Sequence, residues 1–287
     1  MQEKKRSRTR SRWLLPAALV LAGAAWFENF TLSTSTVTVS SAALPEAFSG
    51  LRIVQISDLH GRRFDAESRY LLELVRLQSP DLIALTGDLA DEFTDFSMLP
   101  PLLEGLTALA PTVYVTGNHE WVLSREKRAA LFSLLDAAGV VRLQNEYRLL
   151  EKGPASIVLA GVDDPNGPYD QKRPAQLVRE IRQAEGKGAY ILMLSHRNDE
   201  LDLWANMGVQ TVLCGHGHGG IVRLPFVGAV FGTHLNLFPD YTAGLYQKGQ
   251  TSMIVSRGLG GSRKLPLRIG NRPEVVTIVL KAESGRI

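Results

Sequence analysis

Short apolar runs alternate with amphipathic segments from residue 51 to about residue 219. Such runs are typical of buried strands, whereas apolar residues that recur every three or four positions are typical of helices. The strands are predicted over residues 52–57, 81–86, 112–116, 141–150, 156–162, 190–194 and 209–214. The helices are predicted over residues 68–78, 97–109, 124–138 and 175–184, and between the last two strands. Ser124 is a typical capping residue, and Gly139 is typical of the position just beyond a helix.

The two ends of this region have a different pattern. Residues 31–50 alternate Thr, Ser and Val, which predicts a linker that runs into an edge strand. After residue 219 the chain is rich in Gly, Pro and β-branched residues, with strands expected near 221–231, 252–256 and 275–281. Strand and helix units followed by a strand-rich end predict an α/β fold of packed sheets with helices outside.

The first 30 residues predict a targeting or membrane segment. Residues 1–12 form a basic tail with six Lys and Arg residues and Glu3, and an uncharged run follows from Trp13 to Phe27. As a helix this run spans about 22 Å, which is shorter than the roughly 30 Å hydrocarbon core of a membrane. Aromatic residues at both ends of the run suit the two interfaces.

We predict that residues 13–30 form a membrane anchor or uncleaved signal, preceded by the basic tail. The excess of Lys and Arg predicts a single-pass protein of the cell membrane, with its N-terminus inside and the catalytic domain extracytoplasmic. Two alternatives are a signal peptide cleaved at Ala22-Gly23-Ala24 and a buried helix of the soluble domain.

Composition excludes several classes of protein. The chain has 287 residues, of which 45% are hydrophobic and 21% charged, which excludes intrinsic disorder. Its single cysteine, Cys214, excludes a disulfide framework and a cysteine-based zinc site, and a buried small side chain is expected there. The net charge is +3, but the basic tail carries +5, so the body is nearly neutral. No nucleic-acid partner is therefore expected.

Polar motifs follow five of the predicted strands directly. They are Asp58-Leu59-His60, Gly87-Asp88-Leu89-Ala90-Asp91, Gly117-Asn118-His119-Glu120, Ser195-His196 and Gly215-His216-Gly217-His218-Gly219-Gly220. Taken singly, each motif also suits a turn, a helix cap or a surface histidine. Strand ends at one edge of an α/β sheet nevertheless bring such side chains together.

Together the motifs predict a binuclear metal site. They offer three aspartate carboxylates, five imidazoles and one amide. Clustered carboxylates repel one another unless a cation compensates them. Nitrogen and oxygen ligands without a thiolate suit two divalent metal ions that are Mn, Fe or Zn.

The order of the motifs resembles that of the calcineurin-like metallophosphoesterase family over residues 58–218. The flanking sequences, including LPEAFSGLRIVQISDLH and NRPEVVTIVL, are similar to those of its bacterial membrane-anchored branch and extend the resemblance over about 31–281. The resemblance implies a metallophosphoesterase domain over residues 51–283, built as a four-layer α/β/β/α sandwich. One N-terminal hydrophobic helix precedes it.

The resemblance also implies a role for each residue. The first ion would be held by Asp58, His60 and His218, and the second by Asn118, His196 and His216, with Asp88 bridging both. His119 would contact the phosphate and protonate the leaving oxygen. Asp91 would bind no ion but would fix the His119 ring.

A few polar residues lie outside this assignment. Arg197 stands where the branch more often has another polar residue, and it is a candidate contact for the substrate phosphate or else faces solvent. Gly217 replaces the usual Thr without removing a ligand. His234 is interpreted as a loop residue. The pair Asp163-Asp164 is interpreted as a turn, with lining of the cleft as the alternative.

The implied activity is metal-dependent hydrolysis of a phosphodiester, pyrophosphate or phosphomonoester. The predicted anchor favours a membrane or envelope substrate, such as a phospholipid, a lipid-linked nucleotide or a wall phosphodiester. The branch resembles enzymes that include UDP-2,3-diacylglucosamine pyrophosphohydrolases. Their substrate is made inside the cell, whereas the predicted topology places the domain outside, so the topology argues against this substrate. A metal-binding scaffold without activity and a nuclease are the alternatives.

Overall fold

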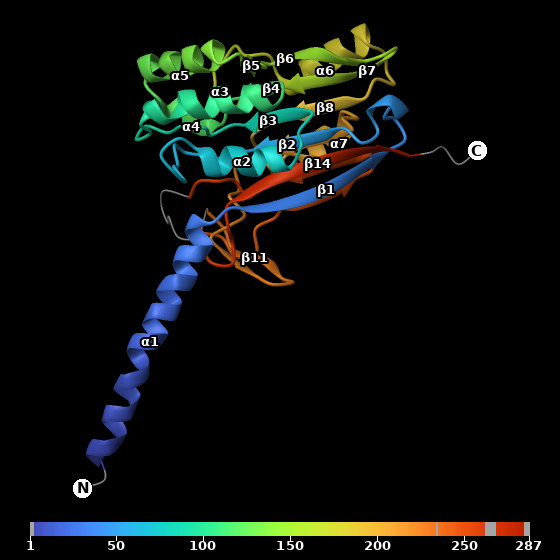
Figure 1. The fold of residues 1–287 in the computed structure, drawn as a ribbon. Helices are drawn as coiled ribbons and strands as arrows, with labels where there is room; N and C mark the ends of the chain where they lie inside the picture. The colour runs from blue at the N-terminus through green and yellow to red at the C-terminus, as the bar shows by residue number, and fades with distance from the viewer. Residues whose placement is uncertain (1–2, 234, 262–267, 284–287) are drawn as a thin grey trace.

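The computed structural model describes residues 3–233, 235–261 and 268–283 (Figure 1). Two six-stranded sheets form its centre. The first sheet has the order β1-β14-β2-β3-β4-β5. Its strands are β1 (Ser33–Ser41), β14 (Glu274–Ala282), β2 (Arg52–Ile56), β3 (Leu82–Thr86), β4 (Thr112–Val115) and β5 (Val141–Arg142). From β2 to β5 neighbouring strands are parallel, and β14 is antiparallel to β2.

The second sheet has the order β12-β13-β9-β8-β7-β6. Its strands are β12 (Gly244–Lys248), β13 (Thr251–Val255), β9 (Thr211–Cys214), β8 (Ile191–Leu194), β7 (Ala155–Gly161) and β6 (Glu146–Lys152). The four central strands are parallel, and each outer strand is antiparallel to its neighbour. A separate hairpin pairs β10 (Val222–Leu224) with β11 (Gly228–Phe231).

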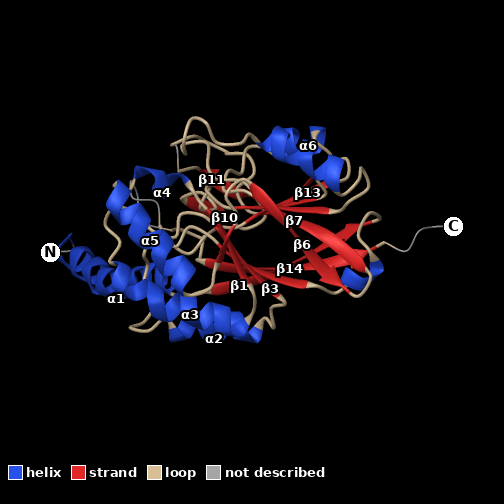
Figure 2. Ribbon diagram, turned by 90° about the horizontal axis from the view of Figure 1, so that it is seen from above, coloured by secondary structure: helices blue, strands red, loops and turns tan. Residues whose placement is uncertain are grey.

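Three apolar clusters show how the layers pack. Along a strand successive side chains point to opposite faces, so Ile53 faces the second sheet while Val54 faces helices. The outer cluster of the first sheet includes α2 (Arg69–Leu77), α3 (Leu99–Leu109) and α5 (Arg125–Ala137). The outer cluster of the second sheet includes α6 (Pro174–Ala184) and α7 (Leu201–Asn206). The layers are therefore helix, sheet, sheet and helix, as predicted (Figure 2).

Most elements lie where the pattern predicts them, with three differences among the strands. The run over 141–150 divides into β5 and β6, because Asn145 adopts a left-handed conformation with φ of 56°. The run over 221–231 is the β10–β11 hairpin rather than one strand. Strand β12, over residues 244–248, was not predicted, because three of its five residues are polar or glycine.

The N-terminal helix α1 (Glu3–Phe30) starts within the predicted basic tail and extends away from the sheets (Figure 1). Among the residues that the structure describes, no helix combines the length and the apolar character needed to cross a membrane. The transmembrane helix predicted over 13–30 is therefore not supported.

Candidate metal centre

The predicted site residues follow strands of both sheets. Loops after β2, β3 and β4 of the first sheet meet loops after β8 and β9 of the second, all at the carboxyl ends of these parallel strands. These loops gather at one end of the two sheets (Figure 2). The site thus lies where α/β sheets usually bind ligands, but two sheets contribute to it.

The first ligand group comprises Asp58, His60, Asp88 and His218. One ligand atom from each residue lies within 4.8 Å of the others. Nε2 of His60 is 3.6 Å from Oδ2 of Asp88, and Nε2 of His218 is 3.6 Å from Oδ1 of Asp58. These four residues can hold one divalent ion with nitrogen and oxygen ligands.

The second ligand group comprises Asp88, His196 and His216. Nε2 of His196 is 3.2 Å from Oδ2 of Asp88 and 3.2 Å from Nδ1 of His216. The other nitrogen of His196 is 2.8 Å from the backbone oxygen of Thr86, which fixes the ring. Asp88 belongs to both groups, which is the position that a shared ligand of two ions must occupy.

Buried polar atoms at the centre indicate that it fits cations. Within the described part of the chain, Nδ1 and Nε2 of His60, Nδ1 of His218 and Oδ1 of Asn118 are buried without a hydrogen-bond partner. Buried polar atoms are almost always paired, so several together require an explanation. A divalent ion accepts lone pairs from imidazole and amide groups and accounts for them.

The backbone is held in an unusual conformation at these residues. Five of the seven predicted metal ligands have φ between 49° and 67°, namely Asp58, His60, Asp88, His216 and His218. Residues other than glycine rarely adopt this conformation, and such strain clusters at functional sites. Hydrogen bonds between loops hold it in place, since the Asp58 and His60 amides donate to the carbonyl oxygens of Gly87 and Asp88.

Two glycines allow the loops to approach closely. A Cβ atom at Gly117 would lie 2.3 Å from Oδ1 of Asp88, and one at Gly215 would lie 1.9 Å from Oγ of Ser57. Both contacts are far below van der Waals distance. The glycines of the GNHE and GHGH motifs are therefore required by packing around the carboxylates.

Burial keeps three of the histidines uncharged. It lowers the pKa of His60 to about 4, and together with the charge of Arg268 it lowers the pKa of His218 to about 3. Burial, followed by the charge of His196, lowers the pKa of His216 to about 2. At neutral pH these rings are neutral, which is the state that binds a metal ion.

Asp88 and His196 form a charged pair. Burial opposes the charge on each, but the charge of His196 holds the pKa of Asp88 well below its usual range. Burial lowers the pKa of His196, but Asp88 raises it more strongly, to about 10. The protein alone thus holds a proton on His196, and binding of a cation there requires its release. Burial raises the pKa of Asp58, because it destabilises the charged carboxylate. A bound cation offsets this destabilisation.

Glu120 organises the centre, a role that its place in the GNHE motif did not reveal. Its buried carboxylate accepts hydrogen bonds from the amides of Asp88 at 3.0 Å, Leu89 at 2.7 Å, Ala90 at 3.3 Å and Gly117 at 2.7 Å. Burial and the charge of Asp88 raise the pKa of Glu120 to about 7. This side chain connects the loop after β3 to the loop after β4.

Arg197 does not extend into solvent. Its guanidinium donates to both carboxylate oxygens of the buried Asp164, at 2.6 and 3.0 Å, and its Nη1 lies 3.1 Å from Nε2 of His216. The side chain is 24% exposed. Arg197 thus lies beside the second ligand group with one face accessible. Asp164, which was interpreted mainly as part of a turn, orients it.

His119 and Asp91 lie at the centre but not as a pair. The His119 amide donates to Oδ1 of Asp88 at 2.8 Å, and its partly exposed ring packs edge-on against His60 with centroids 4.7 Å apart. Asp91 accepts hydrogen bonds from Phe93 and Thr94, and its Oδ2 is 3.9 Å from Nδ1 of His60. Within the described residues Asp91 makes no hydrogen bond to His119, and the histidine that it contacts is His60.

The remaining residues of interest lie apart from the ligand groups. Cys214 is fully buried in β9, as predicted. Asp163 accepts a hydrogen bond at 2.7 Å from the hydroxyl of Thr116, at the end of β4. His234 lies outside the described residues.

Comparison with protein families agrees with this geometry. The family model for calcineurin-like phosphoesterases matches residues 51–220, which include every residue of both ligand groups. This chain belongs to the calcineurin-like phosphoesterase family. Its members include metallophosphoesterases, and the two ligand groups form the candidate metal site of this phosphoesterase.

Curated bacterial relatives cover most of the chain. The uncharacterized metallophosphoesterase YkuE of Bacillus subtilis is 31% identical over 90% of this chain and 89% of its own length. The phosphodiesterase YaeI of Escherichia coli is 31% identical over 80% of this chain and 82% of its own length. The structure of a hypothetical protein from Thermus thermophilus has a TM-score of 0.47 and 19% identity, covering 74% of this chain and 78% of that one. Membership of a membrane-anchored branch stays a prediction.

Proposed function

We propose that this phosphoesterase hydrolyses a phosphodiester with two divalent ions bound in the two ligand groups. The single observation that carries the proposal is the position of Asp88, whose carboxylate belongs to both groups. Two ions about 3.5–4 Å apart are the arrangement found in metal-dependent phosphatases and nucleases. The diester preference is supported by the similarity to YaeI, which is named a phosphodiesterase.

The protein contributes a fixed set of ligands. When bound, two divalent ions lower the pKa of water and neutralise charge on the phosphoryl group. Asp58, His60 and His218 would complete the first site, and Asn118, His196 and His216 the second. Since no thiolate is among them, Mn, Fe and Zn all remain compatible with the ligand set.

Two further residues would act on the substrate. His119 is held against Asp88 through its amide while its ring stays partly exposed, so it can meet a leaving oxygen and donate a proton. Arg197 is oriented by Asp164 and can donate hydrogen bonds to a phosphoryl oxygen. Asp91 would support the ring of His60 rather than that of His119.

A substrate panel tests the proposal. The full chain, supplied with Mn²⁺, is assayed on bis-p-nitrophenyl phosphate, p-nitrophenyl phosphate, a lipid pyrophosphate and single-stranded DNA, and its metal content is measured in parallel. We expect turnover of the diester at the highest kcat/KM. Two bound ions with no turnover of any compound would instead indicate a scaffold, and turnover of DNA alone a nuclease.

The proposal also includes the location of the substrate. We infer a lipid-linked phosphoester outside the cytoplasm, because basic residues followed by an uncharged run are also the pattern of an export signal. A topology reporter fused to the carboxyl terminus tests the location. Reporter activity confined to the cytoplasm would contradict it and direct the search to substrates made inside the cell.

A further inference from the structure

Six large apolar side chains are exposed within one short stretch, residues 221–239, which we name the apolar segment. It contains the β10–β11 hairpin and the loop that follows it. The exposed residues are Leu224, Phe226, Val227, Leu235, Leu237 and Phe238. Clustered exposed apolar side chains on a soluble domain mark an interaction surface, whereas isolated ones do not.

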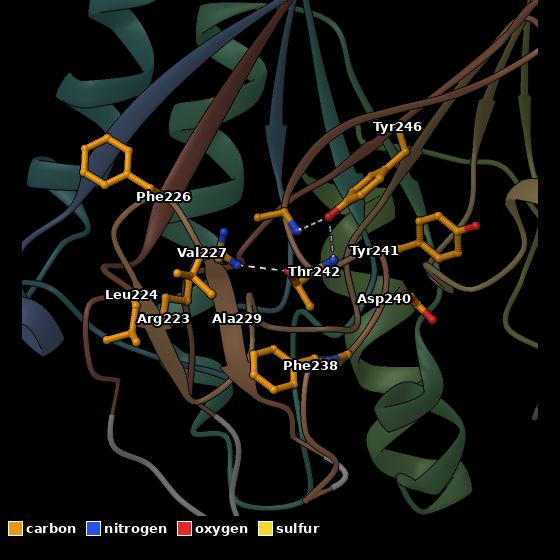
Figure 3. Close-up of a pocket in the computed structure, with 13 residues that line it drawn as sticks. Arg223, Leu224, Phe226, Val227, Ala229, Phe238, Asp240, Tyr241, Thr242 and Tyr246 are labelled. Carbon is orange, nitrogen blue, oxygen red and sulfur yellow. Dashed lines mark hydrogen bonds between the residues drawn. The ribbon is translucent and has the colours of Figure 1, made fainter.

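The aromatic side chains of the apolar segment do not fill the fold. Phe226 stands at the hairpin turn, is fully exposed, and lies at the cavity of about 580 Å³ between the hairpin and residues 238–246 (Figure 3). Phe238 is 64% exposed. Both rings are thus presented to the surroundings.

The apolar segment is continuous with the end of α1. The Arg223 amide donates to the Ile269 carbonyl at 2.8 Å, and the neighbouring Arg268 amide donates to Oδ1 of Asn29 at 2.8 Å. Asn29 lies in the last turn of α1, where Phe27 and Phe30 are also exposed. Figure 1 shows α1 and β11 projecting from the same side of the sheets.

Arginines lie beside the exposed aromatic residues at the end of α1, and the apolar segment carries no acidic residue. The apolar segment contains no Asp or Glu, and Arg223 is its one Lys or Arg. The guanidinium of Arg272 lies 4.4 Å from the ring centroid of Phe27, and that of Arg62 lies 5.3 Å from the ring centroid of Phe30. Basic residues also begin α1. Exposed aromatic rings among cations complement the surface of an anionic membrane.

We propose that the apolar segment and the last turns of α1 dock on an anionic lipid surface. Phe226 and Phe238 would enter the interface between headgroups and acyl chains, with the neighbouring arginines at the headgroups. The occupant is a lipid surface because exposed aromatic residues lie on two separate protruding elements, the apolar segment and the end of α1, and arginines lie beside those of α1. The inference concerns binding alone and does not rest on the proposed hydrolase activity.

Docking would also place the metal centre near the headgroups. A cavity of about 250 Å³ is lined by Arg197 and His216 on one side and by Gly232, Asn236 and Pro239 of the apolar segment on the other. The same stretch of chain therefore forms the lipid-facing turns and a wall of the cavity beside the second ligand group.

An environment-sensitive probe tests the docking directly. The full-length variant F226C is labelled with a nitrobenzoxadiazole thiol reagent, since Cys214, the chain's single cysteine, is buried and inaccessible. Vesicles of phosphatidylglycerol and phosphatidylcholine, or of phosphatidylcholine alone, are then added. We expect a several-fold rise in emission with the anionic vesicles and little change with the neutral ones. No rise at this position would overturn the proposal, whether or not the chain binds vesicles elsewhere.

The matched control is L77C, labelled in the same way. Leu77 is also exposed, but it ends α2 at the opposite end of the sheet from the metal centre. We expect its emission to stay unchanged. A rise at F226C without vesicles, growing with protein concentration, would indicate contact with a second copy of the chain and would overturn the lipid assignment.

Flotation of the vesicles provides an independent measurement. The double variant F226S/F238S should lose at least half of the vesicle-bound fraction of the parent chain, whereas L77S should keep it. Equal flotation of the double variant and the parent would show that these two rings do not contribute, and the proposal would fail. Circular dichroism of both variants establishes that they are folded.

Discussion

The two sheets supply different chemistry to the metal centre. The loops of the first sheet carry all the carboxylates and the amide, together with two of the imidazoles. These residues are Asp58, His60, Asp88, Asp91, Asn118 and His119. The loops of the second sheet carry no carboxylate among the predicted site residues, but three imidazoles and one guanidinium. These residues are His196, Arg197, His216 and His218.

This division means that neither sheet forms a site alone. Contacts between ligands join opposite sheets, since Nε2 of His196 lies 3.2 Å from Oδ2 of Asp88 and the His216 amide donates to Asp58 at 3.1 Å. Each ligand group draws on both sheets. The metal centre thus connects the two sheets at their carboxyl edge, and ions bound there should affect stability as well as reactivity.

Replacing Asp88 should have the largest effect, because it removes the one ligand common to both groups. We expect D88N to lose all detectable diester hydrolysis and to bind fewer than two ions per chain. Steady-state kinetics and elemental analysis measure both. The surface variant D202N, whose carboxylate pairs with Lys248 at an exposed site, is the control. Full metal content in D88N would show that Asp88 is not a shared ligand of two ions.

Replacing His119 should separate reactivity from metal binding. We expect H119A to lower kcat by about 10²–10⁴-fold, the usual contribution of a positioned proton donor. The metal content should stay at the parent value, because His119 belongs to neither ligand group. Loss of metal from H119A would show that this side chain is itself a ligand.

Removing the ions should weaken the connection between the sheets. Ligand present at 100 times its dissociation constant stabilises a folded protein by about 2.7 kcal/mol. For a chain of this size that corresponds to a fall in Tm of roughly 5–10 °C after chelation. Differential scanning calorimetry with and without chelator measures the change. D88N should show a much smaller shift, and an unchanged Tm in the parent chain would contradict a link between the sheets.

Replacing Arg197 should have the smallest of these effects. Lysine keeps the charge but loses the paired hydrogen bonds to Asp164, so the cation is no longer oriented. We expect R197K to raise KM for the diester by about 10-fold, the loss of one charge-assisted hydrogen bond. The exposed variant R179K serves as the control. A fall in kcat with KM unchanged would place Arg197 in the chemical step instead.

Most of the fold could be predicted because its strands and helices have strong local patterns. β3 is apolar along most of its length and buried on both faces, and α5 begins at the capping residue Ser124, whose side chain accepts from the Lys127 amide. The misplaced elements depend on single residues in special conformations, such as Asn145. The strand β12 has a weak pattern, and it extends the sheet by antiparallel pairing with β13.

The ligands could be predicted because short motifs carry them, but their supporting residues could not. Glu120 acts on amides of another loop, and Asp164 acts on a guanidinium 33 positions along the chain. Neither contact leaves a pattern in the sequence. The position of Asp91 could not be predicted from the sequence either. Its contact with His60 depends on how the two loops fold.

Anomalous X-ray diffraction from crystals of the full chain loaded with Mn²⁺ tests the central claim most directly. We predict two anomalous peaks about 3.5–4 Å apart, one on each side of the Asp88 carboxylate, each contacted by side chains from both sheets. A single peak, or peaks that contact residues of one sheet only, would contradict a metal centre shared between the two sheets.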